Sequence, residues 1–199
     1  MFQNRNDIET ILSALAEQLQ EAGAGSIEIV VCGGAALSVL GYIARATMDI
    51  DIVAFAGKNS SGETVLHKAE SLGSLLFSAA EKVKKDFNLN DRWINNEPSS
   101  MMDFGMPRGL MERVETRTYG ESLRVHYIGR YDQIHFKLYA AADQGAGKHY
   151  DDLKALSPSS GEIESAALWA MTHDVSEGFK VILVDLLREL GFSDVADRI

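Results

Sequence analysis

The stretch that decides the fold is Val30–Val53, VVCGGAALSVLGYIARATMDIDIV. It begins inside a short β-branched run, Ile27–Cys32, whose continuous apolar character predicts a strand buried on both faces. The pair Gly33-Gly34 breaks this strand, and apolar residues then recur with helical spacing over Ala35–Tyr42. The sequence therefore predicts a strand, a glycine turn and a helix in immediate succession.

Two carboxylates follow this unit. Asp49 and Asp51 alternate with isoleucines, which predicts a strand over Met48–Phe55 with one acidic and one apolar face. Carboxylates at this spacing share a face, and Mg²⁺ or Mn²⁺ is commonly held by one or two carboxylates together with substrate phosphates. The pair is a candidate metal site. The alternative is a strand whose polar face is simply hydrated.

The glycine pair has two interpretations as well. Without side chains, Gly33 and Gly34 let a polyphosphate approach backbone N–H groups closely. A tight turn with no ligand satisfies the same sequence. A dinucleotide-binding loop is disfavoured because GxGxxG is incomplete, the next glycine being Gly41, and a Walker loop is absent.

The order of these residues resembles the signature of the nucleotidyltransferase (DNA polymerase beta-like) superfamily, a Gly-Gly or Gly-Ser turn followed by Asp-x-Asp. More narrowly it is similar to AbiEii-like toxin nucleotidyltransferases and related small bacterial members, in which an Arg-x-Thr-x-Asp-Ile-Asp run is characteristic. Arg45, Thr47, Asp49 and Asp51 stand in that order here.

A second stretch, IHFKLYAAADQGAGKHYDDLKAL over residues 134–156, resembles the family's downstream helix pair. In the family this pair has a lysine in an Ala-rich helix, followed by a basic residue and an Asp-Leu, and Lys137, Lys148 and Asp152 occupy these positions. His149 stands where an acidic residue often follows the basic one. From the residues alone, Asp152 either forms an ion pair with one of these lysines or begins a helix. Lys137 either reaches nucleotide phosphates or is structural.

The resemblance implies an α/β (α+β) fold, a small mixed sheet flanked by helices with a C-terminal helical cap. It implies Mg²⁺- or Mn²⁺-dependent transfer of a nucleoside monophosphate from an NTP such as ATP to a hydroxyl of tRNA, a protein or a small molecule, in a toxin-antitoxin context. The implied metal and catalytic residues are Asp49 and Asp51. The implied nucleotide-binding residues are Gly33, Gly34, Arg45, Thr47 and Lys137, with Lys148 and Asp152 in support.

A third carboxylate completes the metal site in active members of the superfamily, on a later strand. The later strand predicted here, Leu123–Ile128, presents Arg124, His126 and Ile128 on one face and apolar residues or tyrosine on the other. Asp103, Glu112 and Glu115 are candidates only by their nearness in sequence. A noncatalytic nucleotide- or protein-binding module, or a purely structural α/β domain, is therefore the alternative.

The rest of the chain supplies a hairpin and helices. The hairpin is predicted from Arg113–Tyr119 and Leu123–Ile128, and Asn88–Gly109 is predicted to be irregular. We expect residues 1–156 to form the nucleotidyltransferase-like domain and residues 157–199 to pack on it as a helical segment. The remaining helices are predicted over Asn6–Leu19, Glu63–Phe87, Tyr131–Ala142, Lys148–Leu156, Glu162–His173 and Ser176–Leu190.

Composition places these motifs in an ordinary globular protein of 199 residues, 46% hydrophobic and 24% charged. Its net charge of -10 argues against nonspecific DNA binding by a basic surface. No apolar run is long enough for a membrane span, and Cys32, as the single cysteine, cannot form an internal disulfide. We expect a cytoplasmic protein. The histidine spacings match no zinc motif.

Overall fold

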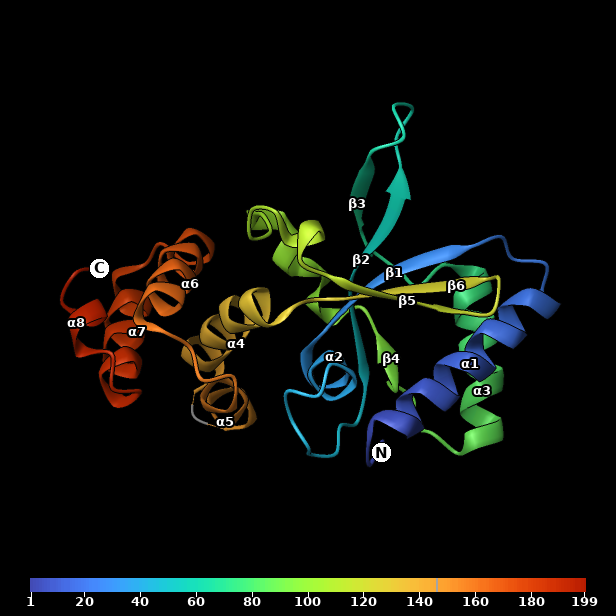
Figure 1. The fold of residues 1–199 in the computed structure, drawn as a ribbon, viewed down its shortest axis with the longest axis horizontal. Helices are drawn as coiled ribbons and strands as arrows, with labels where there is room; N and C mark the ends of the chain where they lie inside the picture. Colours follow the sequence, from blue (N-terminus) through green and yellow to red (C-terminus); the bar gives the residue numbers. More distant parts are fainter. Residues whose placement is uncertain (146) are drawn as a thin grey trace. The chain divides into compact units, whose positions relative to one another are not determined.

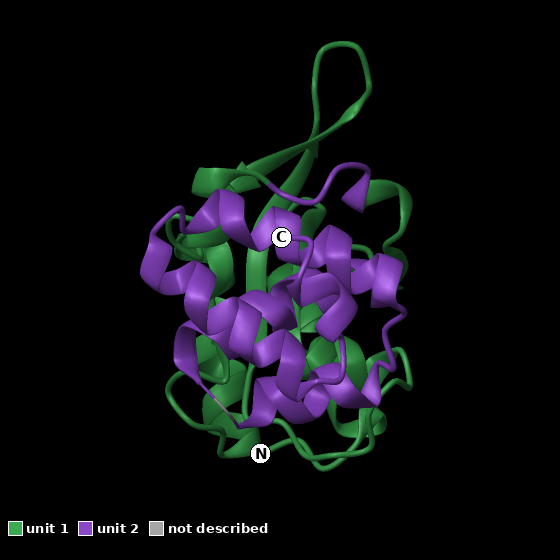
Figure 2. Cartoon of the chain, turned by 90° about the vertical axis from the view of Figure 1, so that its left-hand side faces the viewer, with its two compact units in different colours: residues 1–105, 111–129 green, residues 106–110, 130–199 purple. Residues whose placement is uncertain are grey.

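The computed structural model describes residues 1–145 and 147–199. They divide into two compact units, which Figure 2 shows in different colours. Unit 1 comprises residues 1–105 and 111–129, and unit 2 comprises residues 106–110 and 130–199. This division differs from the expected boundary after residue 156, because the helices of residues 130–155 group with the C-terminal helices rather than with the sheet.

Unit 1 is a mixed sheet with helices, and Figure 1 shows its elements in order. Its strands are β1 (Ile27–Cys32), β2 (Ile50–Lys58), β3 (Thr64–Lys68), β4 (Ile94–Asn95), β5 (Glu115–Tyr119) and β6 (Leu123–Tyr127). Its helices are α1 (Arg5–Glu21), α2 (Gly33–Val39) and α3 (Ser74–Phe87), and 3-10 turns run over η1 (Glu97–Phe104) and, at the junction of the units, η2 (Leu110–Glu112).

The sheet order is β3-β2-β1-β6-β5, and β4 adds to β2 beside its start. β1 is antiparallel to β2 and parallel to β6, while β5 and β6 form the expected antiparallel hairpin. One face of the sheet is covered by α1 and α3, which lie side by side (Figure 1). Alternate strand residues such as Ile29, Val31 and Val125 point into this core. The prediction of a small mixed sheet flanked by helices is confirmed.

The prediction of one long helix over Glu63–Phe87 is wrong for residues 63–73, which precede α3. Residues 64–68 form β3, which pairs antiparallel with β2 and extends the sheet as a hairpin. Asn59 sets the turn, because its Oδ1 accepts hydrogen bonds from the backbone N–H groups of Ser61 and Glu63, both at 2.9 Å. Backbone pairing with β2 therefore overrides the helical spacing, and the helix begins only at Ser74, after Gly73 at φ +71°.

Unit 2 is helical, as expected for the C-terminal third. It contains α4 (Arg130–Gln144), α5 (Lys148–Ala155), α6 (Ser160–His173), α7 (Glu177–Glu189) and the short α8 (Ser193–Ala196). α4 packs on α6 through aromatic contacts. His135, Phe136 and Tyr139 of α4 contact Trp169 of α6, and Tyr139 also contacts His173. Trp169 is thus a packing residue of unit 2.

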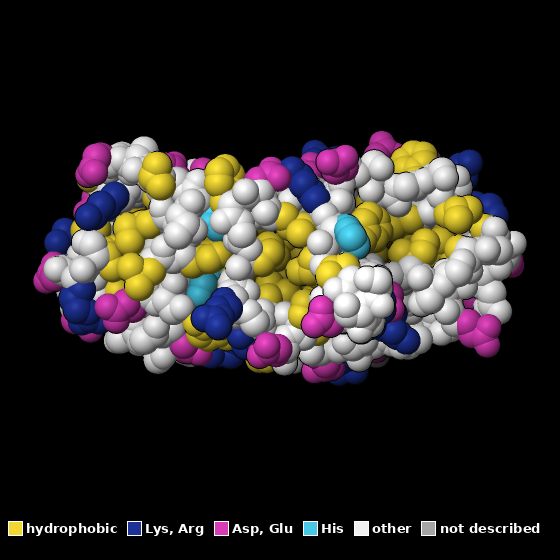
Figure 3. Space-filling model, turned by 90° about the horizontal axis from the view of Figure 1, so that it is seen from above, with side chains coloured by type: hydrophobic (Ala, Val, Ile, Leu, Met, Phe, Trp, Pro, Cys, Tyr) yellow, Lys and Arg dark blue, Asp and Glu magenta, His cyan; other side chains and the backbone are white. Residues whose placement is uncertain are grey.

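The surface carries both signs of charge. On the face drawn in Figure 3, basic side chains are scattered among acidic and hydrophobic ones rather than gathered in one field. None of the helices in the described ranges is long and apolar enough to cross a membrane.

Candidate functional site

The glycine turn closes directly onto the second aspartate. Gly33 has φ +70°, a left-handed backbone conformation that glycine adopts without strain. A Cβ built on Gly33 would lie 2.5 Å from Oδ2 of Asp51, closer than real side chains approach. The register explains this nearness, because Cys32 at the end of β1 pairs with Asp51 at the start of β2. Gly33 is thus required both by the turn and by the carboxylate.

The second glycine faces the other two residues of the motif. A Cβ on Gly34 would lie 2.6 Å from Oγ1 of Thr47 and 3.4 Å from a guanidinium nitrogen of Arg45. Gly34 and Thr47 are buried, and Arg45 is half-buried. The structure therefore brings together Gly33, Gly34, Arg45, Thr47 and Asp51, five of the residues that the resemblance assigns to the site.

Several contacts fix the segment that carries these residues. Thr47 forms a two-bond antiparallel bridge with Phe2, with N···O distances of 2.8 and 3.0 Å. Asn90 donates its side-chain amide to the carbonyl of Met48 at 3.0 Å. Arg45 donates to the carbonyl of Ala46 at 3.0 Å. Because each end of the segment is held, the positions of its side chains are set by backbone contacts and not by the loop alone.

Asp51 is held from its other side by a residue that the sequence did not single out. Asn95 on β4 pairs with Asp51 across the sheet and donates its Nδ2 amide to Oδ1 of Asp51 at 2.9 Å. Oδ1 of Asn95 in turn accepts the backbone N–H of Glu97 at 3.0 Å, which fixes the amide orientation. Asn95 is buried. A strand of two residues has no periodicity, so only its Asn-rich composition signals this role.

The donor set suits a cation that arrives with phosphates. Asp51 lies at the start of β2 and Asp49 immediately precedes the strand, and both are half-buried. Within residues 1–145 and 147–199, no three His, Cys, Asp or Glu side chains gather closely enough to hold a metal by themselves. Two carboxylates with substrate oxygens are a usual Mg²⁺ environment, so this pair fits a shared site and not a closed protein cage.

The candidates for a third carboxylate have other partners. Asp103 pairs with Lys68 at 2.6 Å on the surface, and Glu115 pairs with Arg117 at 2.7 Å. Glu112 is exposed on η2. Asn95, whose side chain is an amide, occupies the position on β4 opposite Asp51. Asp51 is thus supported by an amide donor.

Lys137 and Asp152 form an ion pair within unit 2. Nζ of Lys137 on α4 lies 2.8 Å from Oδ2 of Asp152 on α5, and the two side chains are only 4% and 2% exposed. This pairing selects one of the alternatives left open for Asp152. Lys148 is exposed at the start of α5. All three residues belong to unit 2, whereas the glycine pair and the aspartates belong to unit 1.

Comparison with known proteins gives one match. Residues 9–180 match the model of a family described as "Nucleotidyltransferase of unknown function (DUF6036)". No curated protein and no solved structure matches the chain. The match supports the nucleotidyltransferase superfamily, and the closer likeness to AbiEii-like toxins stays a prediction.

Proposed function

Because the chain belongs to the DUF6036 family of nucleotidyltransferases, we propose that it transfers a nucleoside monophosphate from a Mg²⁺- or Mn²⁺-bound NTP to an acceptor hydroxyl and releases pyrophosphate. The observation that carries the proposal is the contact set of the glycine pair. Gly33 lies against Asp51, and Gly34 lies against Thr47 and Arg45. The missing side chains at these two positions let a carboxylate, a hydroxyl and a guanidinium gather beside the backbone, and the triphosphate would bind to this group.

Each residue then has a defined part. Asp49 and Asp51 would hold the cation together with phosphate oxygens, and Arg45 would offset the phosphate charge. The cation, when bound, stabilises the charge that develops on the phosphates as pyrophosphate leaves. Asn95 keeps Asp51 in one rotamer, so that Oδ2 stays on the side of Gly33. Lys137 has no phosphate contact in this proposal, because its ammonium group is paired with Asp152.

A second candidate is a noncatalytic nucleotide-binding module. The observation that favours it is the amide of Asn95 beside Asp51, at a position where a third carboxylate would join the pair. In such a module the cation and nucleotide bind but no acceptor is modified. A toxin-antitoxin role and a cytoplasmic location remain expectations under both candidates.

The test is Mg²⁺-dependent binding of the four NTPs, measured by thermal shift, followed by pyrophosphate release with RNA, protein and small hydroxyl acceptors. Asp49→Asn and Asp51→Asn each remove a ligand, so we expect them to abolish the Mg²⁺-dependent shift. The apo proteins should stay within about 1 kcal/mol of the parent or become slightly more stable, because like charges no longer repel. Asp86→Asn, which removes an exposed carboxylate of α3, is the matched control.

The outcomes separate the candidates. Binding with turnover supports the transferase, and binding without turnover on any acceptor supports the noncatalytic module. If Asp49→Asn or Asp51→Asn lowers apo stability by several kcal/mol, the aspartates are structural residues with buried partners, and the proposal fails.

A further inference from the structure

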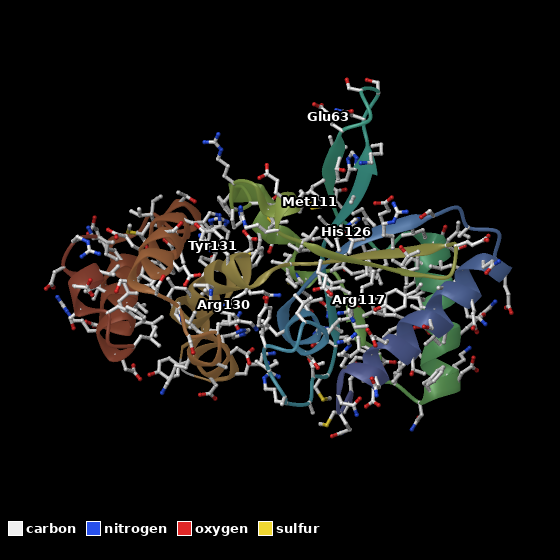
Figure 4. All side chains as sticks on the ribbon, in the orientation of Figure 1. Glu63, Met111, Arg117, His126, Arg130 and Tyr131 are labelled. Atoms are coloured by element: carbon white, nitrogen blue, oxygen red, sulfur yellow. The ribbon has the colours of Figure 1, made fainter. Side chains whose placement is uncertain are left out.

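A second group of chemically active side chains lies on the sheet face that carries Asp51. Glu28 of β1, His126 of β6 and Thr116 of β5 come from neighbouring strands, and His126 is labelled in Figure 4. Their strand neighbours, such as Ile29 and Val125, point into the core under α1 and α3. Because side chains alternate along a strand, the three polar residues project from the opposite face.

The three side chains form a directed chain of hydrogen bonds. Nε2 of His126 lies 2.9 Å from Oε2 of Glu28, and Nδ1 lies 2.8 Å from Oγ1 of Thr116. Arg124 donates to Oε1 of Glu28 at 2.9 Å. An ionised Glu28 only accepts, so Nε2 of a neutral His126 carries the proton and Nδ1 accepts the hydroxyl proton of Thr116.

The three hydrogen-bonded residues differ in their exposure to solvent. His126 is 7% exposed and the Glu28 side chain is 18% exposed, whereas Thr116 is an exposed residue. The hydroxyl of an exposed threonine is therefore bonded to a buried imidazole, which a carboxylate orients. These are the roles of nucleophile, general base and orienting group.

We propose that Thr116 is itself a nucleotide acceptor, an inference that rests on the proposed function. Oγ1 of Thr116 bonds to the α-phosphorus of the NTP, the bond from that phosphorus to the pyrophosphate oxygen breaks, and pyrophosphate leaves. The hydroxyl proton passes to Nδ1 of His126, and Glu28 stabilises the resulting imidazolium. The product is Thr116 carrying a nucleoside monophosphate as a phosphodiester.

The donor nucleotide belongs to a second copy of the chain. β5 is the edge strand, and β1 and β6 separate it from β2. Three strand spacings amount to roughly 14 Å, too far for Thr116 to reach a nucleotide held at Asp51 of the same sheet. An edge strand with an exposed threonine is open to approach by another molecule.

The test uses the full chain with Mg²⁺ and each NTP labelled at the α-phosphate, followed by intact mass measurement and peptide mapping. We expect one nucleoside monophosphate on Thr116. Thr116→Val should abolish the label and Thr116→Ser should keep it. Thr118→Val is the matched control, since Thr118 lies on the same strand but faces Arg124 in the register. His126→Gln should slow labelling by about 10²–10⁴-fold, the usual contribution of a general base.

A mixing experiment tests transfer between copies. Thr116→Val chains supply the intact aspartate pair, and affinity-tagged Asp51→Asn chains supply the intact threonine. We expect label only on the tagged chains, at a rate that rises with donor concentration. Label that persists in folded Thr116→Val protein, or that maps to another residue, overturns the inference. The inference is also overturned if the protein shows a Mg²⁺-dependent NTP shift and releases pyrophosphate with another acceptor but carries no label. The proposed function then stands. Failure of all NTP binding overturns both.

Discussion

At the scale of single residues, Gly33 shows how one position serves the backbone and the site together. A side chain there must adopt φ +70° and also displace Oδ2 of Asp51. Gly41 separates the two effects, because it has φ +78° with nothing within 4 Å of an added Cβ. We expect Gly33→Ala and Gly41→Ala each to lose about 1–2 kcal/mol of stability from the left-handed backbone. Urea unfolding measures this loss.

Nucleotide binding distinguishes the two variants. Only Gly33→Ala moves the carboxylate, so it should weaken Mg²⁺-ATP binding at least about tenfold, equivalent to about 1.4 kcal/mol. Gly41→Ala should bind as the parent does. If both variants titrate with ATP alike, the contact between Gly33 and Asp51 has no part in nucleotide binding.

At the scale of elements, the ion pair of Lys137 and Asp152 joins α4 to α5 inside unit 2. Removing one partner leaves a buried charge, so we expect Lys137→Met to cost about 3–5 kcal/mol. Adding Asp152→Leu should recover much of that loss, because the buried carboxylate is then removed as well. Urea unfolding of the two proteins tests this, with Lys148→Met as an exposed control within about 0.5 kcal/mol of the parent.

The same variants decide the role of Lys137 toward the nucleotide. A structural Lys137 predicts that the folded double variant binds Mg²⁺-ATP as the parent does. Unchanged stability of Lys137→Met together with weakened ATP binding would instead return this lysine to the phosphate contact that the family resemblance implies.

At the scale of the whole molecule, one carboxylate, Glu162, makes the free energy of unfolding depend on pH in the acid range. The guanidinium of Arg130, with help from the Ser159 N-cap, lowers the pKa of Glu162 to about 2. The backbone N–H of Ser159 donates to Glu162 at 2.8 Å, and Arg130 also donates to the carbonyls of Leu156 and Ser157. Glu162 thus connects the start of α4 with the junction of α5 and α6.

The sign of the pH effect follows from this lowered pKa. The unfolded carboxyl takes up a proton near its ordinary value of about 4.3, before the folded one does. The stabilisation is therefore complete above about pH 5 and is lost as pH falls toward 2. Glu162→Gln should cost about 1–2 kcal/mol at pH 7 and flatten the pH dependence of unfolding in that window. The control is Glu189→Gln, an exposed site of unit 2, and equal slopes in both variants would contradict the assignment.

The sequence by itself determined the local units of the site. Alternation of Asp49 and Asp51 with isoleucines, and the glycine break after Ile27–Cys32, predict a strand, turn, helix and acidic strand, because such periodicities depend on neighbours a few residues apart. The structure has the strand, the helix and the acidic strand in this order. The helix begins directly at Gly33, so the two glycines form its first turn rather than a separate one, and the acidic strand begins at Ile50.

Only the tertiary structure decided which distant residues join them. Asn95 lies 44 residues from Asp51 in sequence, and His126 lies 98 residues from Glu28. β3 lacks any local signal that outweighs its helical spacing, and it exists because β2 offers it backbone partners. Contacts of this range depend on how strands are ordered in the sheet, and that order is set by packing of the whole core rather than by any short stretch of sequence.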